Sequence, residues 1–339
     1  MALTTVNISA ASAQFRRHLE IRGLTAGTLK THSALHNHLV EVWGDISVSN
    51  ISPRHIDNLF SDMEWAPATR NLYLGNVRQF FAWCRVHGYM RRDSDPTTGW
   101  RNAKIPRSEK LRIPIEHFND LMDAASHPRD RAIIAMGLFT FMRASELQTL
   151  RIGDIDLGRS EITMTRHKTR EDDVMPISTE LHKELVAYLN WYRADQTHLS
   201  ANWFLLPAKE KVPWINDPHL GRLVDPGIVA SLKPLTKVTH PYRAVQRAMA
   251  QLGYDVGGEG GHTLRRSGAR ALADHLRGMG YDGALLRVAS MLGHKDTRMT
   301  ERYIGWELER SQRNEQIAGK PMFGDLLNTD AGMLKVVGE

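Results

Sequence analysis

The chain of 339 residues carries 44 Lys and Arg against 38 Asp and Glu, and 42% of its residues are hydrophobic. This length predicts a sizeable core and two domains, and the composition excludes a disordered chain. The basic balance, with a formal net charge of +6, favours an anionic partner such as nucleic acid.

The apolar segments and the single cysteine indicate an intracellular protein. The longest apolar run, Ala132 to Met142, is too short for a membrane span, which needs about 20 residues. The N-terminal residues lack the basic start and continuous apolar segment of a secretory signal. Cys84 is the only cysteine, which excludes an intramolecular disulfide and a cysteine metal cluster. Its large apolar neighbours predict a buried thiol. We expect a cytoplasmic protein without membrane association.

Residues 1–95 have the apolar periodicity of four helices. Glycines mark the predicted helix ends, and the pair Ser52 and Pro53 marks a predicted start. We expect these helices to form an N-terminal four-helix domain. The apolar positions expected to face its core are Phe15, Leu19, Ile21, Leu29, Leu35, Leu39, Val42, Ile56, Leu59, Phe60, Leu72, Val77, Phe80, Phe81 and Val86.

A basic stretch separates this domain from the rest of the chain. From Arg91 to Arg112 there are prolines, no apolar periodicity, and seven basic against three acidic residues. We place an interdomain linker at 96–112. Two interpretations remain open: a solvated linker, or a strap that closes around a phosphate backbone. Lys104 and Arg107 are its candidate DNA contacts.

Residues 113–339 predict a second domain with a C-terminal tail. A helix begins at about Ile115, and the apolar run predicts a buried helix after it. In "SEITMTRHKTREDDVMPIS", Ile162 and Met164 alternate with threonines and a second short strand follows, which predicts a hairpin. Further helical segments follow. The predicted fold class is therefore mainly α with a small antiparallel β-sheet.

The predicted helix "GHTLRRSGARALADHLRG" places an arginine on its core-facing side. On a helical wheel Arg265 shares a stripe with Leu264 and Gly268, whereas Arg266 lies beyond its edge. A buried arginine needs an anionic partner because an unpaired buried charge is costly. His262 lies close to Arg265 on the helix surface. An internal salt bridge is the alternative explanation.

Two more cationic residues stand at element ends. Arg143 directly follows the apolar run, and Glu146 has the spacing that lets a carboxylate hold its guanidinium. Lys168 stands in the predicted hairpin, just past a strand. Taken singly, Arg143 and Glu146 could also form an ordinary ion pair at a helix end. Lys168 could also be a solvated turn residue.

Together these residues resemble the tyrosine recombinase family, the integrases and Xer-type enzymes that share their catalytic domain with type IB topoisomerases. The resemblance covers about residues 115 to 306 and rests on "FMRASELQTLRIGDID", "RHKTREDDVMPI", "HTLRRS" and "MLGHKDTRMTERYIG". It implies an N-terminal DNA core-binding domain followed by a catalytic domain. The catalytic residues that it implies are Arg143, Lys168, His262, Arg265, His294 and Tyr303, with Glu146 in support.

The resemblance also implies a mechanism. Tyr303 is the nucleophile, His262 assists removal of its proton, and Lys168 protonates the departing 5′ oxygen. Arg143, Arg265 and His294 neutralise or hydrogen-bond the phosphate oxygens. A 3′-phosphotyrosyl link keeps the bond energy, so neither a cofactor nor a metal is implied. The rival is a metal-dependent nuclease, suggested by 16 histidines, but a His-Glu-x-x-His motif and clustered carboxylates are missing from the sequence.

The implied function is site-specific recombination through a four-way junction, as a phage or mobile-element integrase in the cytoplasm of a bacterial host. The partners that follow are double-stranded DNA attachment or core sites and a homotetramer on DNA, weakly associated without it, with room for an accessory DNA-bending protein. An Xer-type dimer resolvase, a type IB topoisomerase and a non-catalytic DNA-binding protein remain the alternatives. Lys30, Arg70 and Arg78 are candidate phosphate contacts on the N-terminal domain, and a solvated face is the alternative for each.

Overall fold

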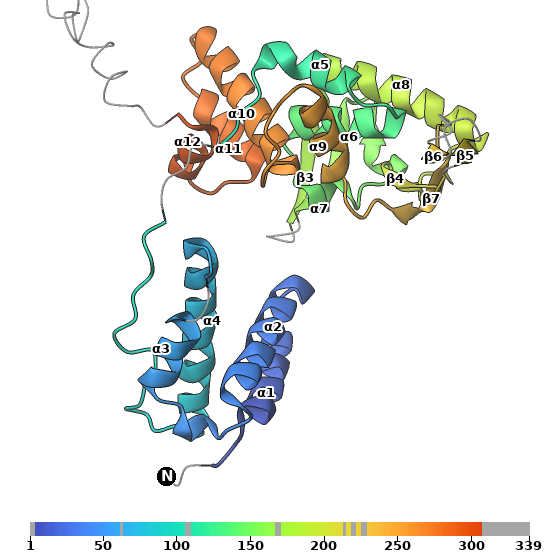
Figure 1. Ribbon diagram of the computed structural model, residues 1–339. Coiled ribbons are helices and arrows are strands. Elements are labelled where there is room, and N and C mark those ends of the chain that lie inside the picture. The colour runs from blue at the N-terminus through green and yellow to red at the C-terminus, as the bar shows by residue number, and fades with distance from the viewer. Residues whose placement is uncertain are drawn as a thin grey trace, which may run out of the picture. The chain divides into compact units, whose positions relative to one another are not determined.

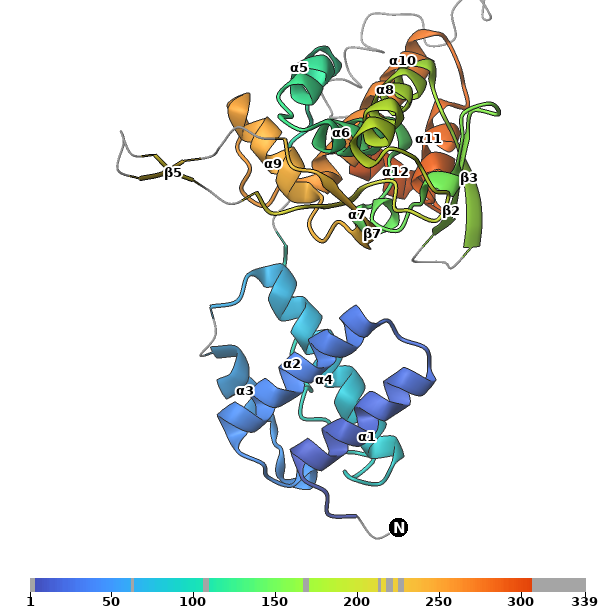
Figure 2. The same ribbon diagram turned by 90° about the vertical axis from the view of Figure 1, so that its right-hand side faces the viewer.

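The computed structural model describes residues 4–61, 64–105, 110–166, 171–212, 215–217, 222–224 and 229–306. Contacts divide the chain into two compact units, Met1–Ser108 and Glu109–Glu339, which are drawn in Figures 1 and 2. Both are built mainly from helices, and the strands pair into small antiparallel sheets. The predicted fold class is confirmed.

The described residues of the first unit form four α-helices and one short 3-10 helix (Figure 2). Their bounds are α1 Ile8–Ile21, α2 Ala26–Trp43, η1 Val48–Asn50, α3 Pro53–Ser61 and α4 Pro67–Val86. The side chain of Thr25 caps α2 by accepting a hydrogen bond from the Thr28 N–H. Prolines occupy the first position of α3 and of α4, where no intrahelical donor is lost.

Most of the predicted apolar positions meet in one core of the first unit. Phe15, Phe80 and Phe81 are buried in it, and Cys84 belongs to the same buried cluster, as expected. The residues that contradict the prediction are exposed: Ile21, Val42, Leu72 and Val86. Ile21 and Val86 are the last residues of their helices.

The first part of the predicted linker packs on the helices of this unit. Trp100 donates its indole N–H to Asp57 (2.9 Å), and the guanidinium of Arg70 lies 4.9 Å from the centre of the Trp100 ring. Arg78 donates to the Trp100 carbonyl. The Asn71 side chain exchanges two hydrogen bonds with the backbone of Ala103 (2.9 and 2.7 Å). This part of the segment is therefore held against helices α3 and α4 of the first unit by hydrogen bonds and ring contacts.

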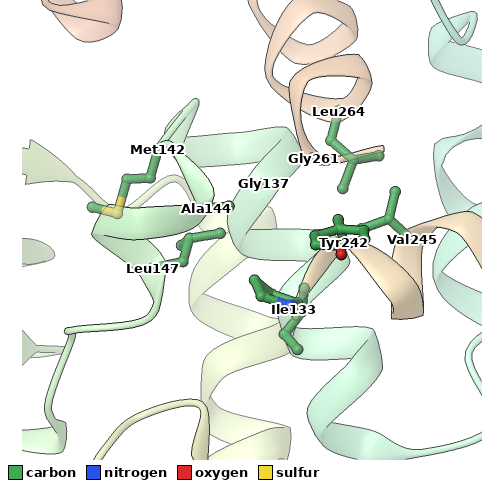
Figure 3. Close-up of a pocket in the computed structure, with 10 residues that line it drawn as sticks. Ile133, Gly137, Met142, Ala144, Leu147, Tyr242, Val245, Gly261 and Leu264 are labelled. Atoms are coloured by element: carbon green, nitrogen blue, oxygen red, sulfur yellow. The ribbon is translucent and has the colours of Figure 1, made fainter. Parts of the chain in front are cut away.

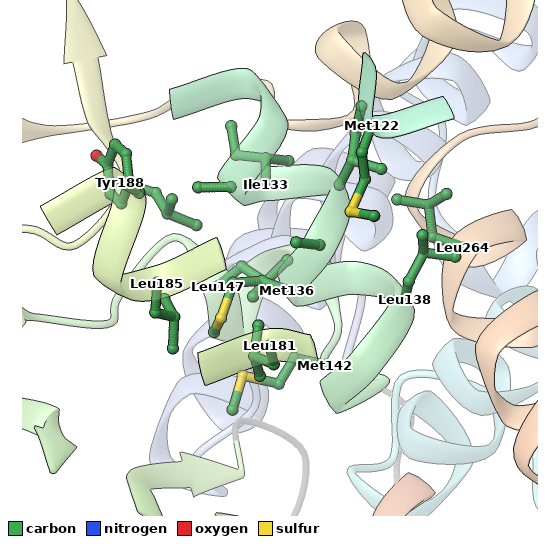
Figure 4. Packing of buried hydrophobic residues seen from close by; sticks show 14 of the residues in the cluster. Met122, Ile133, Met136, Leu138, Met142, Leu147, Leu181, Leu185, Tyr188 and Leu264 are labelled. Carbon is green, nitrogen blue, oxygen red and sulfur yellow. The ribbon is translucent and has the colours of Figure 1, made fainter. Parts of the chain in front are cut away.

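The second unit is organised around helix α6, Pro128–Thr140, which contacts α5, α7, α8, α9 and α10. Because it is covered on nearly all sides, almost every residue of α6 is buried, which explains the continuous apolar run. Figure 4 shows Ile133, Met136 and Leu138 facing side chains of α8 and α10. The other helices are η2 Ile115–His117, α5 Phe118–Asp123, α7 Ala144–Leu147, η3 Ile152–Asp154, α8 Thr179–Gln196, α9 Tyr242–Gln251, α10 Gly261–Gly278, α11 Ala284–Leu292 and α12 Thr297–Ile304.

Antiparallel strands complete the described part of the second unit. The strands β1 Ile155–Asp156, β2 Glu161–Arg166 and β3 Glu171–Pro176 form a sheet in that order. The predicted hairpin is β2 and β3, with Ile162 opposite Met175 and Arg166 opposite Glu171. Two smaller sheets pair β4 Pro207–Lys209 with β7 Leu232–Lys237, and β5 Ile215–Asp217 with β6 Arg222–Val224. Among the described helices, none combines the length and apolarity needed to cross a bilayer.

Candidate active site

The corner between α6 and α7 presents Arg143. Helix α6 ends because Phe141 adopts a left-handed conformation with φ of 56°, and Arg143 then takes an extended conformation before α7. The carboxylate of Glu146 accepts the backbone N–H of Arg143 (2.7 Å) and its guanidinium N–H (2.9 Å). One side chain therefore caps the helix and orients the guanidinium.

Helix α10 crosses α6 closely because both helices have glycine at the crossing. A methyl group on Gly268 would overlap the carbonyl oxygen of Leu138, and one on Gly137 would press against the side chain of Leu264. Any larger residue at either position would push the helices apart. This approach brings the N-terminal turn of α10 against the α6–α7 corner.

Arg265, one turn before Gly268, is buried against that corner and is 1% exposed. It donates to the backbone carbonyls of Phe141 and Leu292, the latter at 2.5 Å, and its Nη1 lies 4.0 Å from Glu146 Oε2. Burial lowers the pKa of Arg265 to about 10, so the guanidinium is still charged at neutral pH. The predicted core-facing placement of Arg265 is confirmed by its burial.

The phenol of Tyr303, on α12, lies against His262 at the start of α10. Its hydroxyl donates to the His262 carbonyl (3.2 Å) and lies 3.5 Å from Nδ1 of the same residue. The Arg265 guanidinium carbon is 6.0 Å from the centre of the phenol ring. Burial raises the pKa of Tyr303 above its ordinary 10, although the positive charge of Arg265 opposes this shift. The resting phenol is therefore protonated.

Burial and the nearby Arg265 and Arg143 charges lower the pKa of His262. A histidine with a pKa below its usual 6.5 is neutral at pH 7. A neutral imidazole can accept a proton, and the phenol beside it has one to give. The pair thus has the protonation states that general-base activation of a hydroxyl requires.

His294 approaches Tyr303 from the turn between α11 and α12. Gly293 ends α11 with φ of 62°, a conformation that favours glycine. The Nδ1 of His294 is hydrogen-bonded to the hydroxyl of Thr300 (3.0 Å), which is fully buried. The ring of His294 stands edge-on to the ring of Tyr303, with centroids 5.5 Å apart and planes at 89°.

Arg143 borders two openings of the second unit. One pocket of about 320 Å³ is lined by Arg143, Arg166, His294 and residues of β3, and another of about 210 Å³ by Arg143 and His262. A third, apolar pocket lies behind α7 and the start of α10, between Leu147 and Leu264 (Figure 3). Its volume of about 10 Å³ is no more than one water occupies, so it offers no ligand site.

The structure brings together the side chains of Arg143, His262, Arg265, His294 and Tyr303 within one site of the second unit. Lys168 and the rest of the hairpin turn lie outside the described residues. The site combines two guanidinium groups, two imidazoles and a protonated phenol, which suits binding of an anion next to an oxygen nucleophile. Within the described ranges, no group of three or more His, Cys, Asp or Glu is arranged to hold a metal ion.

Arg266 contradicts its prediction, because it is buried rather than beyond the edge of the core-facing stripe. Its guanidinium donates to the Leu111 carbonyl (2.9 and 2.6 Å) and to Glu259 (2.8 Å). The helical wheel assumes one buried face, whereas the first half of α10 is covered on several sides. Arg266 anchors the first residues of the unit to that helix.

Arg166 is a residue of the site that sequence reasoning missed. It is 5% exposed, and one of its nitrogens, Nη1, lies 3.8 Å from Glu146 Oε2. Strand alternation was the available signal, because it places Arg166 on the same inward face of β2 as Ile162 and Met164.

The predicted DNA contacts of the first unit and linker have mixed surroundings. Lys30 and Lys104 are exposed, as a phosphate contact requires. Arg70 and Arg78 are only part-exposed and hold the segment around Trp100. Arg107 lies outside the described residues.

The chain is similar in sequence to known integrases and recombinases, and similar in fold to a solved integrase structure. Residues 112–309 match the phage integrase family. A putative integrase/recombinase of Sinorhizobium fredii is 27% identical over 248 residues, which cover 70% of this chain but only 50% of that protein. The tyrosine recombinase XerD of Xanthomonas campestris is 26% identical over 273 residues, covering 77% and 76%. A lambda integrase tetramer bound to a Holliday junction has a chain with a TM-score of 0.63 at 17% identity, covering 88% and 78%, and therefore shares the fold.

Proposed function

Since the match spans more than half of its residues, the chain belongs to the phage integrase family, and we propose that it is a tyrosine-type site-specific DNA recombinase. The observation that carries this proposal is that Tyr303 on α12 meets His262 and Arg265 on α10, and Arg143 at the corner between α6 and α7. We assign it to integration of a phage or mobile element, acting on DNA in a bacterial cytoplasm.

The proposed reaction begins with binding of one DNA phosphate. A phosphodiester repels nucleophiles because its oxygens are anionic, so its charge has to be neutralised before attack. Arg143 and Arg265 provide two guanidinium forks for the non-bridging oxygens. Glu146 holds the first fork by a direct hydrogen bond, at 2.9 Å. His294 adds a hydrogen bond to the same phosphate.

Tyr303 then attacks the phosphorus atom. Its hydroxyl proton passes to His262 while the new P–O bond forms, and the bond from phosphorus to the 5′ oxygen breaks. Lys168 gives that oxygen its proton. The product is a 3′-phosphotyrosyl link and a free 5′ hydroxyl, whose attack in the reverse sense rejoins DNA. The steps balance without a cofactor.

The proposed assembly is a homotetramer on two double-stranded core or attachment sites, weakly associated without DNA and open to an accessory DNA-bending protein. The fold shared with a lambda integrase tetramer on a Holliday junction supports it. Lys30 and Lys104 are proposed phosphate contacts, as is Arg107. Arg70 and Arg78 are proposed to combine such contacts with their contacts to the segment around Trp100.

A nicked suicide substrate tests the proposal directly. Wild-type protein should become covalently attached to the 3′ end of the cut strand in the presence of EDTA. Tyr303→Phe should bind the same DNA with unchanged affinity and form no adduct. An adduct that survives this substitution would show that Tyr303 is not the nucleophile.

The outcome on supercoiled DNA distinguishes related functions. Relaxation of plasmids that lack special sites by a monomer would assign the chain to type IB topoisomerases. Strand exchange between two sites with a trapped four-way junction would support the recombinase. Binding without any adduct would leave a non-catalytic DNA-binding protein.

A further inference from the structure

The carboxylate of Glu146 lies among three guanidinium groups in the described part of the second unit. Arg143 donates to it at 2.9 Å, Arg166 approaches it to 3.8 Å and Arg265 to 4.0 Å. Glu146 itself is 1% exposed. A single buried carboxylate is therefore shared by the two proposed phosphate-binding arginines and by Arg166.

Arg166 is held from three directions. It donates to Asp173 on β3 (2.7 Å), to the backbone carbonyl of Met291 on α11 (2.8 Å) and to the sulfur of Met175 (3.3 Å). Its Nη1 is buried and makes no hydrogen bond within the described residues. That nitrogen lies 3.8 Å from the Glu146 carboxylate, while Nη2 of the same guanidinium pairs with Asp173 at 2.6 Å.

The net charge of this cluster determines how strongly it attracts a phosphate. The three guanidiniums are offset by Glu146 and Asp173, which leaves a net charge of about +1 by formal counting. The Asp173 side chain is 37% exposed, so water screens part of its charge. Arg166 is buried, so water screens its attraction to Glu146 less.

We propose that Arg166 is a positioning residue for the phosphate reaction, which offsets the charge of Glu146 and so leaves the positive field of Arg143 and Arg265 available to the scissile phosphate. This inference rests on the proposed recombinase function. The Nη1 of Arg166 is buried and lies 3.8 Å from Glu146 Oε2. Arg166 acts through Glu146.

A purely structural role would be a clamp that joins β2, β3 and α11, and the two roles predict different substrate dependence. Replacing one non-bridging oxygen of the scissile phosphate by a methyl group gives a neutral methylphosphonate, which needs little positive field. The test therefore compares adduct formation on a phosphodiester and on a methylphosphonate suicide substrate. Arg166→Met removes the charge at similar length, and Arg166→Lys keeps it.

We expect Arg166→Met to slow adduct formation about 10- to 100-fold on the phosphodiester and by less than a few-fold on the methylphosphonate. Arg166→Lys should recover most of the phosphodiester rate. DNA affinity should stay unchanged in both variants. Equal slowing on the two substrates, with no advantage for Lys over Met, would overturn the inference and show a structural clamp.

Asp173→Asn is the matched control and keeps the test decisive if Arg166→Met does not fold. Removing this negative charge raises the local net charge, so the inference predicts a phosphodiester rate at least equal to that of wild type. A clamp that depends on the ion pair predicts slowing on both substrates. Wild-type protein that forms no adduct on the phosphodiester contradicts the proposed function itself, whatever the variants do.

Discussion

The hydroxyl of Tyr303 lies 3.2 Å from the backbone carbonyl oxygen of His262 and 3.5 Å from its ring nitrogen Nδ1. The two residues are 41 positions apart and belong to helices α12 and α10. The phenol is therefore docked within its own chain beside the group proposed to take its proton.

His262→Ala should slow adduct formation about 100-fold, the usual size of a general-base contribution. Wild-type activity should also fall as the pH drops through the pKa of His262, which burial places below 6.5, because the protonated ring cannot accept the phenol proton. In the His262→Ala variant this fall of the rate at acidic pH should be absent. His275→Ala, an exposed histidine of the same helix, should leave rate and pH profile unchanged. A variant profile that keeps this fall would contradict the assignment.

Lys168→Ala should be rescued by a better leaving group. With sulfur at the 5′ bridging position the departing group needs little protonation, so the variant and the wild type should react at similar rates. With oxygen there, the variant should be slower by about 100-fold or more. The measurement is adduct formation on matched suicide substrates. Equal slowing on both would remove the general-acid role.

Glu146→Gln should destabilise the second unit by about 3–5 kcal/mol, since breaking a buried ion pair leaves uncompensated charge. The amide oxygen of Gln can still accept the Arg143 backbone N–H that caps α7, so the loss comes from the missing negative charge. Urea unfolding, followed by fluorescence, measures it. Glu171→Gln is the control, because this carboxylate is exposed, and its effect should stay within about 0.5 kcal/mol. Equal effects would argue against the buried cluster.

Gly268→Ala should cost about 1–3 kcal/mol of unfolding free energy, because the added methyl overlaps the Leu138 carbonyl and separates α10 from α6. Arg265 moves with α10, so adduct formation should fall as well. Gly278→Ala on the same helix has open space around the added methyl and should be neutral or slightly stabilising. Chemical denaturation of both variants checks the prediction, and matching stabilities would refute the close crossing.

The first unit should lose stability in acid because of His36. Burial and the neighbouring His32 lower the pKa of His36 from 6.5 to about 3. Between these two pKa values the His36 side chain is protonated in the unfolded chain but neutral in the folded unit. Its stability is fully present above pH 6.5 and falls below it by about 1.4 kcal/mol per pH unit until the pKa of the folded state is reached.

Hydrogen exchange in the full-length chain can follow the helices α2 and α4 as the pH is lowered. His36→Leu, which cannot titrate, should flatten the dependence of their protection on pH. His55→Leu, at a half-buried site, is the comparison and should leave the slope close to that of wild type. A slope that stays unchanged in His36→Leu would exclude this histidine as the cause.

The mainly helical class, the hairpin and the core-facing placement of Arg265 followed from local sequence patterns: apolar runs, an alternating strand, and a helical wheel that puts Arg265 beside Leu264. The choice of Arg143 and Arg265 as site residues followed from the motifs that resemble the tyrosine recombinase family, because the local patterns alone also allowed ordinary ion pairs. These local patterns predict the type of secondary structure and which single face of an element is buried. They therefore predict correctly where an element packs against its neighbours on one face only.

The tertiary structure alone decided how Arg166, Arg265 and Glu146 meet, and it reversed the expectation for Arg266. Their distances depend on the glycine-mediated crossing of α10 and α6 and on the approach of β2 to the end of α11, contacts between segments more than a hundred residues apart. The periodicity of a single helix or strand carries no information about such contacts between distant segments. Burial of a charge is set by everything that surrounds it, and an element covered from several sides has no single polar face to predict.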